Sequence, residues 1–505
     1  MPASHSAALQ GTSLIPASPD VIVIGGGTAG AAASRLLASW GHLVLLVERE
    51  VSRAPLAESL PPSCIPLLEA IGVRAAIDAA GVVRGGGNTV WWGGAPMRVE
   101  PFPRGGLGYQ VLRERLEGVL GECAALAGAV RLRPATAVRV EREGELHAVE
   151  LSLPGGRHIV RAPWVLDCSG RSGVMARASR VAPPGGVRTI ALIGVWEREG
   201  GWSLPDETHT LVESAEWGWG WSVPVSRERR FFTAMVDPGA TPVVGEGGLT
   251  PRYDELLRSL PALGALVRDG RCEGAPWAYE ATPYHSTEVA TPGALLVGDA
   301  ASMIDPLSSF GVKKALASAW LAAVVAHTAL VTPEHRDAAL ALHRSREGEY
   351  VRSASRALGG VSREARAGGS VAPFWSVRAD DEGDDANADA VQRLRGDPEV
   401  LAAFAAIRGA PSVRLVADST AGRVMRPVVR GNVVVPEEHL VLRDFPAGVR
   451  YLRSVDLLSL IDVATRHEDV GEMYAQYARM MGGVSLPDFL GALSVLAGKG
   501  ALRFA

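Results

Sequence analysis

Lysine is almost absent from this chain. Of its 51 basic residues only three are lysine, at Lys313, Lys314 and Lys499, and arginine supplies the rest. The formal net charge of −4 gives no general attraction to nucleic acid or to an anionic membrane, so we expect neither as a partner. A reaction that needs a lysine must use one of these three side chains.

Cysteine and long apolar runs are also scarce. The four cysteines form no CxxC pair, so we predict reduced thiols in a cytoplasmic protein, with no metal site and no disulfide framework. The most apolar stretch, residues 316–331, contains Ser318 and His327 and falls short of the roughly 20 residues of a membrane span. We predict a buried helix there. Residues 1–18 lack the pattern of a signal peptide and are expected to form a disordered tail.

A glycine-rich turn follows the first apolar run, residues 21–24. It reads Gly25-x-Gly27-x-x-Gly30 and is followed by an Ala-rich helix and a second apolar run that ends in Glu48. The glycines permit the turn, the approach of a pyrophosphate to the helix N-terminus and close helix–strand packing. A carboxylate about 20 residues on accepts hydrogen bonds from a ribose. We therefore predict a Rossmann-type dinucleotide site that uses Gly25, Gly27, Thr28, Ala29, Gly30, Glu48 and Arg49.

A second motif, Gly298-Asp299-Ala-Ala, follows a short buried strand at residues 294–297. With this motif in place, the sequence resembles the flavoprotein monooxygenase and flavin-dependent halogenase superfamily over residues 20–330. The resemblance implies FAD as the cofactor, with the GD aspartate at its ribityl chain, and NAD alone is the weaker alternative. It also implies further cofactor-binding residues, namely Arg113, Asp167, Gly298, Asp299, Phe310, Gly311 and Val312.

A third motif, at residues 218–224, resembles the GWxWxIP signature of the halogenases, and residues 57–62 resemble their GES-type segment. Trp219 and Trp221 alternate along one strand, so both side chains face one side and would separate the flavin from the substrate chamber. The alternative is a stripe of tryptophans that only fills the core between two domains.

The sequence departs from the halogenases where their chemistry is concentrated. Residues 84–89 replace the segment that carries the halogenase lysine, and arginine is no substitute because its guanidinium stays charged. Ser308 stands where tryptophan halogenases carry a glutamate. Lys313 and Lys314 remain as possible replacements, although a cation beside a phosphate or a carboxylate is the expected role there. The candidate catalytic residues are Glu58, Lys313, Trp219 and Trp221.

The pattern of elements predicts an α/β fold with two domains. A Rossmann-type FAD-binding domain spans residues 19–358 and contains an inserted antiparallel substrate sheet at about 186–288. An acid-rich linker at 359–395 leads to a small α+β domain at 396–505, which resembles a peptide-recognising, PqqD-like winged helix; a lid without a ligand is the alternative. Helices are expected at 109–126, 455–464, 470–481 and 486–497 (Ser485 as N-cap), and strands at 432–435, 439–443 and 449–452.

The leading prediction for function is an FAD-dependent monooxygenase. Reduced FAD, supplied by NAD(P)H directly or through a partner reductase, would react with O2 to a C4a-hydroperoxide that hydroxylates an aromatic substrate. A tryptophan side chain in a peptide or protein is the narrower hypothesis. The alternatives are a flavin-dependent halogenase of an aromatic substrate and a peptide-recruiting flavoprotein without oxygenase activity.

Overall fold

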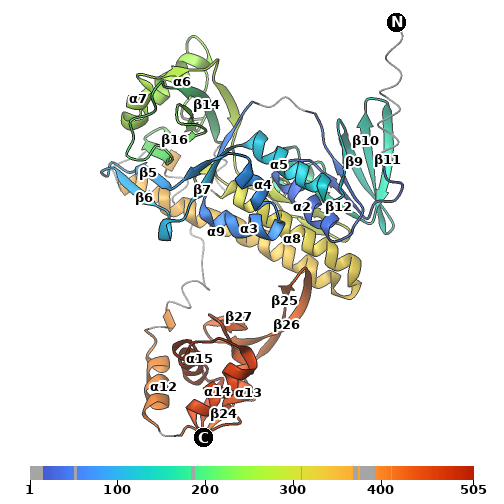
Figure 1. The fold of residues 1–505 in the computed structure, drawn as a ribbon, viewed down its shortest axis with the longest axis vertical. Helices are drawn as coiled ribbons and strands as arrows, with labels where there is room; N and C mark the ends of the chain where they lie inside the picture. Colours follow the sequence, from blue (N-terminus) through green and yellow to red (C-terminus); the bar gives the residue numbers. More distant parts are fainter. Residues whose placement is uncertain are drawn as a thin grey trace. The chain divides into compact units, whose positions relative to one another are not determined.

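The computed structural model describes residues 15–50, 54–182, 188–308, 310–367, 374–375, 393–394, 396–410 and 412–505. The expected tail at 1–18 therefore lies largely outside the described residues, and the acidic residues of the expected linker, at 380–385, lie wholly outside them. The chain forms two compact units (Figure 1). Unit 1 comprises Met1–Arg336 and Leu340–Gly383, and unit 2 comprises Asp337–Ala339 and Asp384–Ala505.

A six-stranded, mostly parallel sheet forms the centre of unit 1. Its order is β21-β22-β12-β1-β2-β8, and only the pairing of β21 with β22 is antiparallel. Its inner strands are apolar runs buried on both faces, as parallel sheets require. The strands are β21 Ala290–Thr291, β22 Ala294–Leu296, β12 Trp164–Asp167, β1 Val21–Ile24, β2 Val44–Val47 and β8 Val130–Leu132.

Helices cover this sheet and include the expected buried one. Helix α2 (Thr28–Ser39) packs against α5 (Arg113–Leu126) and α8 (Gly311–Val331). By length and composition α8 could cross a membrane, but it is mostly buried inside unit 1, with Ser318 and His327 both buried. The helix expected at 109–126 begins only at Arg113, because Gly108–Leu112 pairs as β7 with β3 (Ala57–Leu60) and β4 (Val83–Gly85).

The inserted sheet of unit 1 is antiparallel through β14 (Ile190–Glu197), β17 (Arg229–Val236), β16 (Gly218–Pro224) and β15 (Thr210–Ala215), as expected. It also recruits earlier residues, because β5 (Gly87–Trp91) pairs with β15 in parallel and β6 (Arg98–Pro101) follows it. At the other edge, β14 pairs with β18 (Arg271–Cys272) and β19 (Trp277–Glu280). Helices α6 (Leu249–Ser259) and α7 (Pro261–Val267) cover one face (Figure 1).

The remaining elements of unit 1 are shorter, apart from one long helix. A separate antiparallel sheet consists of β9 (Thr136–Glu143), β10 (Leu146–Leu153) and β11 (Gly156–Ala162). Helix α9 (Arg336–Ala367) continues through residues 359–367, where a linker was expected to begin. The others are α3 Ile65–Ile71, α4 Arg74–Ala79, β13 Arg180–Val181, β20 Tyr284–Ser286 and β23 Ser302–Met303.

Unit 2 has a hydrophobic core of its own, formed by residues between Leu394 and Leu502. The expected helices are present as α13 (Leu457–Ala464), α14 (Val470–Met481) and α15 (Leu486–Gly498), and Ser485 caps α15 by accepting from the backbone N–H of Asp488. The separate strands expected at 432–435 and 439–443 are wrong, because both belong to β26. The remaining elements are α12 Pro398–Gly409, β24 Leu415–Ala417, β25 Arg423–Arg430, β26 Val433–Leu442, β27 Phe445–Val449, β28 Tyr451–Leu452, β29 Val455–Asp456 and β30 Leu502–Phe504. The winged-helix resemblance stays a prediction.

Candidate active site

A cavity of about 1750 Å³ opens in unit 1. Its wall includes the residues that follow four parallel strands: Gly25 after β1, Glu48 after β2, Cys168 after β12 and Asp299 after β22. Open α/β sheets bind ligands at this carboxyl edge. The antiparallel sheet supplies the facing wall, so one continuous cavity adjoins both parts of unit 1.

The glycine-rich turn forms a close-packed cradle at the N-terminus of α2. Gly25 has a φ of 102°, and a Cβ there would lie 2.5 Å from the carbonyl oxygen of Cys168. A Cβ at Gly30 would lie 1.8 Å from the carbonyl oxygen of Gly25, so helix and turn touch as the motif predicts. Helix α2 has no side-chain cap, and Gly27, Thr28 and Ala29 line the cavity. Its first N–H groups suit an anionic pyrophosphate.

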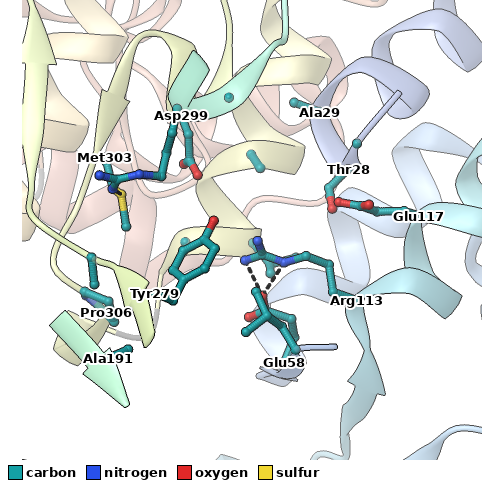
Figure 2. Close-up of a pocket in the computed structure, with 18 of the residues that line it drawn as sticks. Thr28, Ala29, Glu58, Arg113, Glu117, Ala191, Tyr279, Asp299, Met303 and Pro306 are labelled. Carbon is teal, nitrogen blue, oxygen red and sulfur yellow. Dashed lines mark hydrogen bonds and ion pairs between the residues drawn. The ribbon is translucent and has the colours of Figure 1, made fainter. Parts of the chain in front are cut away.

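The two cofactor motifs meet in space although about 270 residues separate them along the chain. A Cβ at Gly298 would lie 3.1 Å from the Cβ of Ala29. Asp299 and Thr28 both point into the cavity in Figure 2. The glycine-rich turn and the corner formed by Gly298 and Asp299 (the GD corner) can therefore contact one dinucleotide together.

Glu48 has a partner that the sequence did not reveal. Arg131 of β8 donates from Nε and Nη2 to the two carboxylate oxygens of Glu48, at 2.7 and 3.1 Å. The pair forms because β8 lies beside β2 in parallel, with Leu46 opposite Arg131. Arg49 also lines the cavity and donates to Ser172 Oγ at 3.3 Å. Glu48 is thus oriented at the end of its strand, where a ribose hydroxyl is expected.

An ion pair stands at the middle of the cavity wall. Arg113, the first residue of α5, donates from Nε to Glu58 Oε1 of β3 at 2.7 Å. Burial disfavours the charge of Arg113, but the nearby Glu58 carboxylate, with Tyr279 and Asp299, holds its pKa above the ordinary value. Figure 2 shows the Tyr279 side chain between Asp299 and this ion pair. Tyr279 was not predicted; its only signal was alternation with Trp277 along β19.

The predicted tryptophans lie together on the cavity wall. The rings of Trp219 and Trp221 are 5.1 Å apart at 84°, and both line the cavity with Trp277. Between them, a Cβ at Gly220 would lie 2.4 Å from Cδ1 of Leu260, because α7 packs on the other face of β16. Trp219 is also part of a buried cluster, so it both fills the core and faces the cavity.

Five predicted site residues do not line the cavity, namely Gly30, Asp167, Gly298, Phe310 and Lys313. Asp167 is fully buried and accepts from the backbone N–H groups of Ser169 and Met175 at 3.0 and 2.7 Å, so it shapes the turn after β12. Lys313 Nζ lies 5.3 Å from the ring centre of Phe310. Gly311 and Val312 do line it. The cofactor contacts and catalytic roles expected of these residues stay predictions.

No lysine is among the described residues that line the cavity. Lys314 is buried and donates to the carbonyl oxygens of Gly298 and Ser302. No group of three or more His, Cys, Asp or Glu side chains in the described part of the chain is arranged to hold a metal ion.

Comparisons with known proteins agree with this geometry. A family model described as "FAD binding domain" matches residues 18–340. The chain is 31% identical over 328 residues to the tryptophan 2-halogenase of Chondromyces crocatus, a match that spans 61% of each chain. It is similar in structure to CmlS, a flavin-dependent halogenase (TM-score 0.75, 20% identity, 96% of each chain). It is also similar to the peptidyl tryptophan dihydroxylase QhpG (TM-score 0.66, 24% identity, 93% of this chain and 100% of that one).

Proposed function

The chain belongs to the FAD-binding domain family, and on this premise we propose that it is a flavin-dependent monooxygenase that hydroxylates an aromatic substrate. Its similarity to flavin-dependent halogenases supports a flavin-dependent oxidation of this kind. In such a reaction dioxygen would supply the oxygen atom and the reduced flavin the two electrons, while the protein supplies position and electrostatics.

The cavity suits a cofactor and a second molecule at once. Its volume of about 1750 Å³ exceeds the roughly 300–1,000 Å³ of common ligand pockets. We expect the N-terminus of α2 to hold the pyrophosphate, Glu48 the ribose, and Arg113 with Asp299 the middle of the cofactor. The space towards β16 and β19 is then left for an aromatic ring, with Trp221, Trp277 and Tyr279 as its wall.

The observation that favours hydroxylation is the composition of the cavity wall. The wall contains arginine, glutamate, tyrosine and tryptophan, but no lysine among its described residues. A halogenase that passes its oxidised halide to a lysine would lack that side chain here. Lys314 is tied to two carbonyl oxygens in the core, and Lys313 lies outside the wall.

For the substrate we propose a tryptophan side chain within a peptide or protein. The support is the likeness to QhpG, whose name states that it dihydroxylates a peptidyl tryptophan, over 93% of this chain. Indole rings stack well on tryptophan and tyrosine walls. Unit 2 would recruit the peptide by adding it as a strand to the β25–β26–β27 sheet.

Halogenation is the second candidate, and two observations favour it. The matched relative from Chondromyces crocatus is a tryptophan 2-halogenase, and Trp219 and Trp221 lie in the segment that resembles the halogenase signature. A halogenase of this kind would have to work through Lys313 or without a lysine.

One assay separates these proposals. The protein is incubated with FAD, a flavin reductase with NAD(P)H, isotopically heavy dioxygen, bromide and tryptophan-containing peptides, beginning with those encoded beside this gene. We expect mass spectrometry to show one or more heavy oxygen atoms on the peptide. A bromine isotope pattern would support the halogenase instead. Peptide binding without any product would support a recruiting flavoprotein.

The variant Lys313→Met serves as the control for a lysine-dependent reaction. Because Lys313 does not line the cavity, hydroxylation by this variant should match the parent protein. Loss of turnover with retained FAD would contradict the proposed reaction and favour the lysine-dependent alternative. Omitting the reductase tests whether NAD(P)H reduces the flavin directly.

A further inference from the structure

The backbone of the GD corner is hydrogen-bonded by side chains that do not line the cavity. Gly298 has a φ of 62°. The next residue, Asp299, lines the cavity, whereas Gly298 does not. A carboxylate meets a bound cofactor in one orientation only if the backbone that carries it is fixed. The corner, Gly298–Ala300, is a single 3-10 turn that joins β22 to the short strand β23.

Helix α8 supplies three hydrogen bonds to this corner. The backbone N–H of Gly298 donates to Ser318 Oγ at 3.0 Å. Lys314 Nζ donates to the carbonyl oxygens of Gly298 and Ser302 at 2.7 and 2.6 Å. Lys314 and Ser318 are four residues apart, so they lie on one face of the helix. The backbone is thus bound on both sides of Asp299.

Helix α9 completes the arrangement with a buried carboxylate. Ser318 Oγ donates to Glu347 Oε1 at 2.6 Å, and Glu347 Oε2 lies 3.7 Å from Lys314 Nζ. The two charged side chains are only 1% and 3% exposed. One turn earlier, His343 Nε2 lies 3.0 Å from the carbonyl oxygen of Leu296, at the end of β22. Two helices therefore hold the strand end and the corner together.

Stability alone does not explain a buried ion pair, because the cost of removing two charges from water offsets most or all of their attraction. Well-packed apolar residues in the same place often give equal or greater stability. Here the lysine also satisfies two carbonyl oxygens of the corner, and the glutamate accepts a hydrogen bond from the serine and lies within ion-pair distance of the lysine. The pair therefore determines geometry more than it determines stability.

We propose that Lys314, Ser318 and Glu347 are positioning residues for FAD, which hold the Gly298–Asp299 backbone so that the Asp299 carboxylate meets the cofactor. The proposal rests on FAD binding alone and is independent of whether the enzyme hydroxylates or halogenates. It assigns Lys314 a role in cofactor affinity that needs no contact between the lysine and the cofactor.

The test is the full-length double variant Lys314→Met/Glu347→Leu. It replaces the pair by apolar side chains and removes the two hydrogen bonds from Lys314 to the corner, while the bond between Gly298 and Ser318 can remain. We expect the dissociation constant for FAD, measured by flavin fluorescence on the apoprotein, to rise about tenfold, equal to about 1.4 kcal/mol. The thermal unfolding midpoint of the apoprotein should change little, because the gain from removing a buried ion pair is offset by two carbonyl oxygens that lose their donor. A dissociation constant within twofold of the parent value would overturn the proposal.

Two further variants test whether a loss of FAD affinity comes from general instability or from misfolding. Lys499→Met removes a second ion-paired lysine, which is half-buried and pairs with Asp397, Glu399 and Asp444 within unit 2, and it should leave FAD affinity unchanged. An equal loss of affinity in Lys499→Met would show a general effect of instability and overturn the proposal. If the double variant does not fold, Ser318→Ala takes its place. It should weaken FAD several-fold, and an unchanged affinity would count against the positioning role.

Discussion

At the scale of single residues, the cavity is organised by ion pairs between elements distant in sequence. Arg113 and Glu58 come from α5 and β3, whereas Arg131 comes from β8 and Glu48 follows directly after β2. In each pair a carboxylate on or directly after a strand is oriented by an arginine, whose planar guanidinium can bind it through two N–H groups. Each pair stands at a wall where an anionic cofactor with hydroxyl groups is expected.

Arg113→Met should weaken FAD binding about tenfold or more. A hydrogen bond to a charged group contributes about 1.5–3 kcal/mol, and the variant also leaves the half-buried Glu58 carboxylate facing the cofactor without its partner. Titration of the apoprotein with FAD measures the effect. Arg74→Met, which removes an exposed arginine paired with Glu69 and Asp78, is the matched control and should bind FAD as the parent does. Equal affinities for the two variants would contradict the prediction.

The sequence identifies residues whose role follows from local pattern, and it misses partners that only the fold supplies. Glu48 is found because it follows an apolar run about 20 residues after the glycine-rich turn, and Asp299 because it belongs to a Gly-Asp motif that follows a short apolar run. Arg131 is not, because its contact needs β8 to pair with β2 across 83 residues of chain. Lys314 is singled out from the scarcity of lysine, yet its burial between α8, α9 and the GD corner becomes visible only in three dimensions.

At the scale of elements, β16 illustrates how glycines place large side chains. Gly218 has a φ of 148°, and a Cβ there would lie 2.0 Å from the carbonyl oxygen of Met235 on β17. The backbones can therefore pair closely at the start of the strand, which sets the register of Trp219 opposite Met235. The tryptophans face the cavity because this register is fixed.

Gly218→Ala should lower the unfolding midpoint of unit 1 more than Gly200→Ala does. Both glycines have positive φ, so both alanines carry backbone strain of about 1–2 kcal/mol. Only at Gly218 must the Cβ also displace a strand backbone, since nothing lies within 4 Å of a Cβ at Gly200. Differential scanning calorimetry of both variants gives the comparison. Equal midpoints would show that β16 and β17 are free to separate.

The boundaries of helices and strands are where prediction from the local sequence pattern fails. Residues 109–112 continue the apolar pattern of α5, but pairing with β3 and β4 makes them a strand, so tertiary contacts override propensity. Likewise β25 was missed because Pro427 interrupts it, although an edge strand tolerates proline. The helices of unit 2 were found because capping residues and periodicity agree there.

At the scale of the whole molecule, the two units have separate cores, and we expect them to unfold in separate transitions. The candidate FAD site lies within unit 1. FAD at 100 times its dissociation constant should therefore stabilise unit 1 by about 2.7 kcal/mol and leave unit 2 unchanged. Calorimetry with and without FAD tests this. A rise of both transitions together would show that the units unfold as one.

Buried and half-buried histidines should make the molecule less stable in mild acid. Burial lowers the pKa of His42, His147, His327, His343 and His439 below the ordinary value of about 6.5. As the pH falls below about 6.5, the unfolded chain binds protons that the folded chain does not. The free energy of unfolding then falls by up to about 1.4 kcal/mol per pH unit for each proton that only the unfolded chain binds. Above about pH 6.5 this loss is absent.

His343 is the clearest case, because it is fully buried between α9 and the end of β22. In His343→Gln an amide can still donate to the carbonyl oxygen of Leu296, but nothing at that position titrates. We expect the unfolding midpoint of the parent protein to fall between pH 7 and pH 5 and that of the variant to fall less. An equal fall of the midpoint with pH in both proteins would mean that His343 is protonated in the folded protein as readily as in the unfolded chain. A variant with a steeper fall would mean that the imidazole stabilises the acid form, and the direction of its pKa shift would then be wrong.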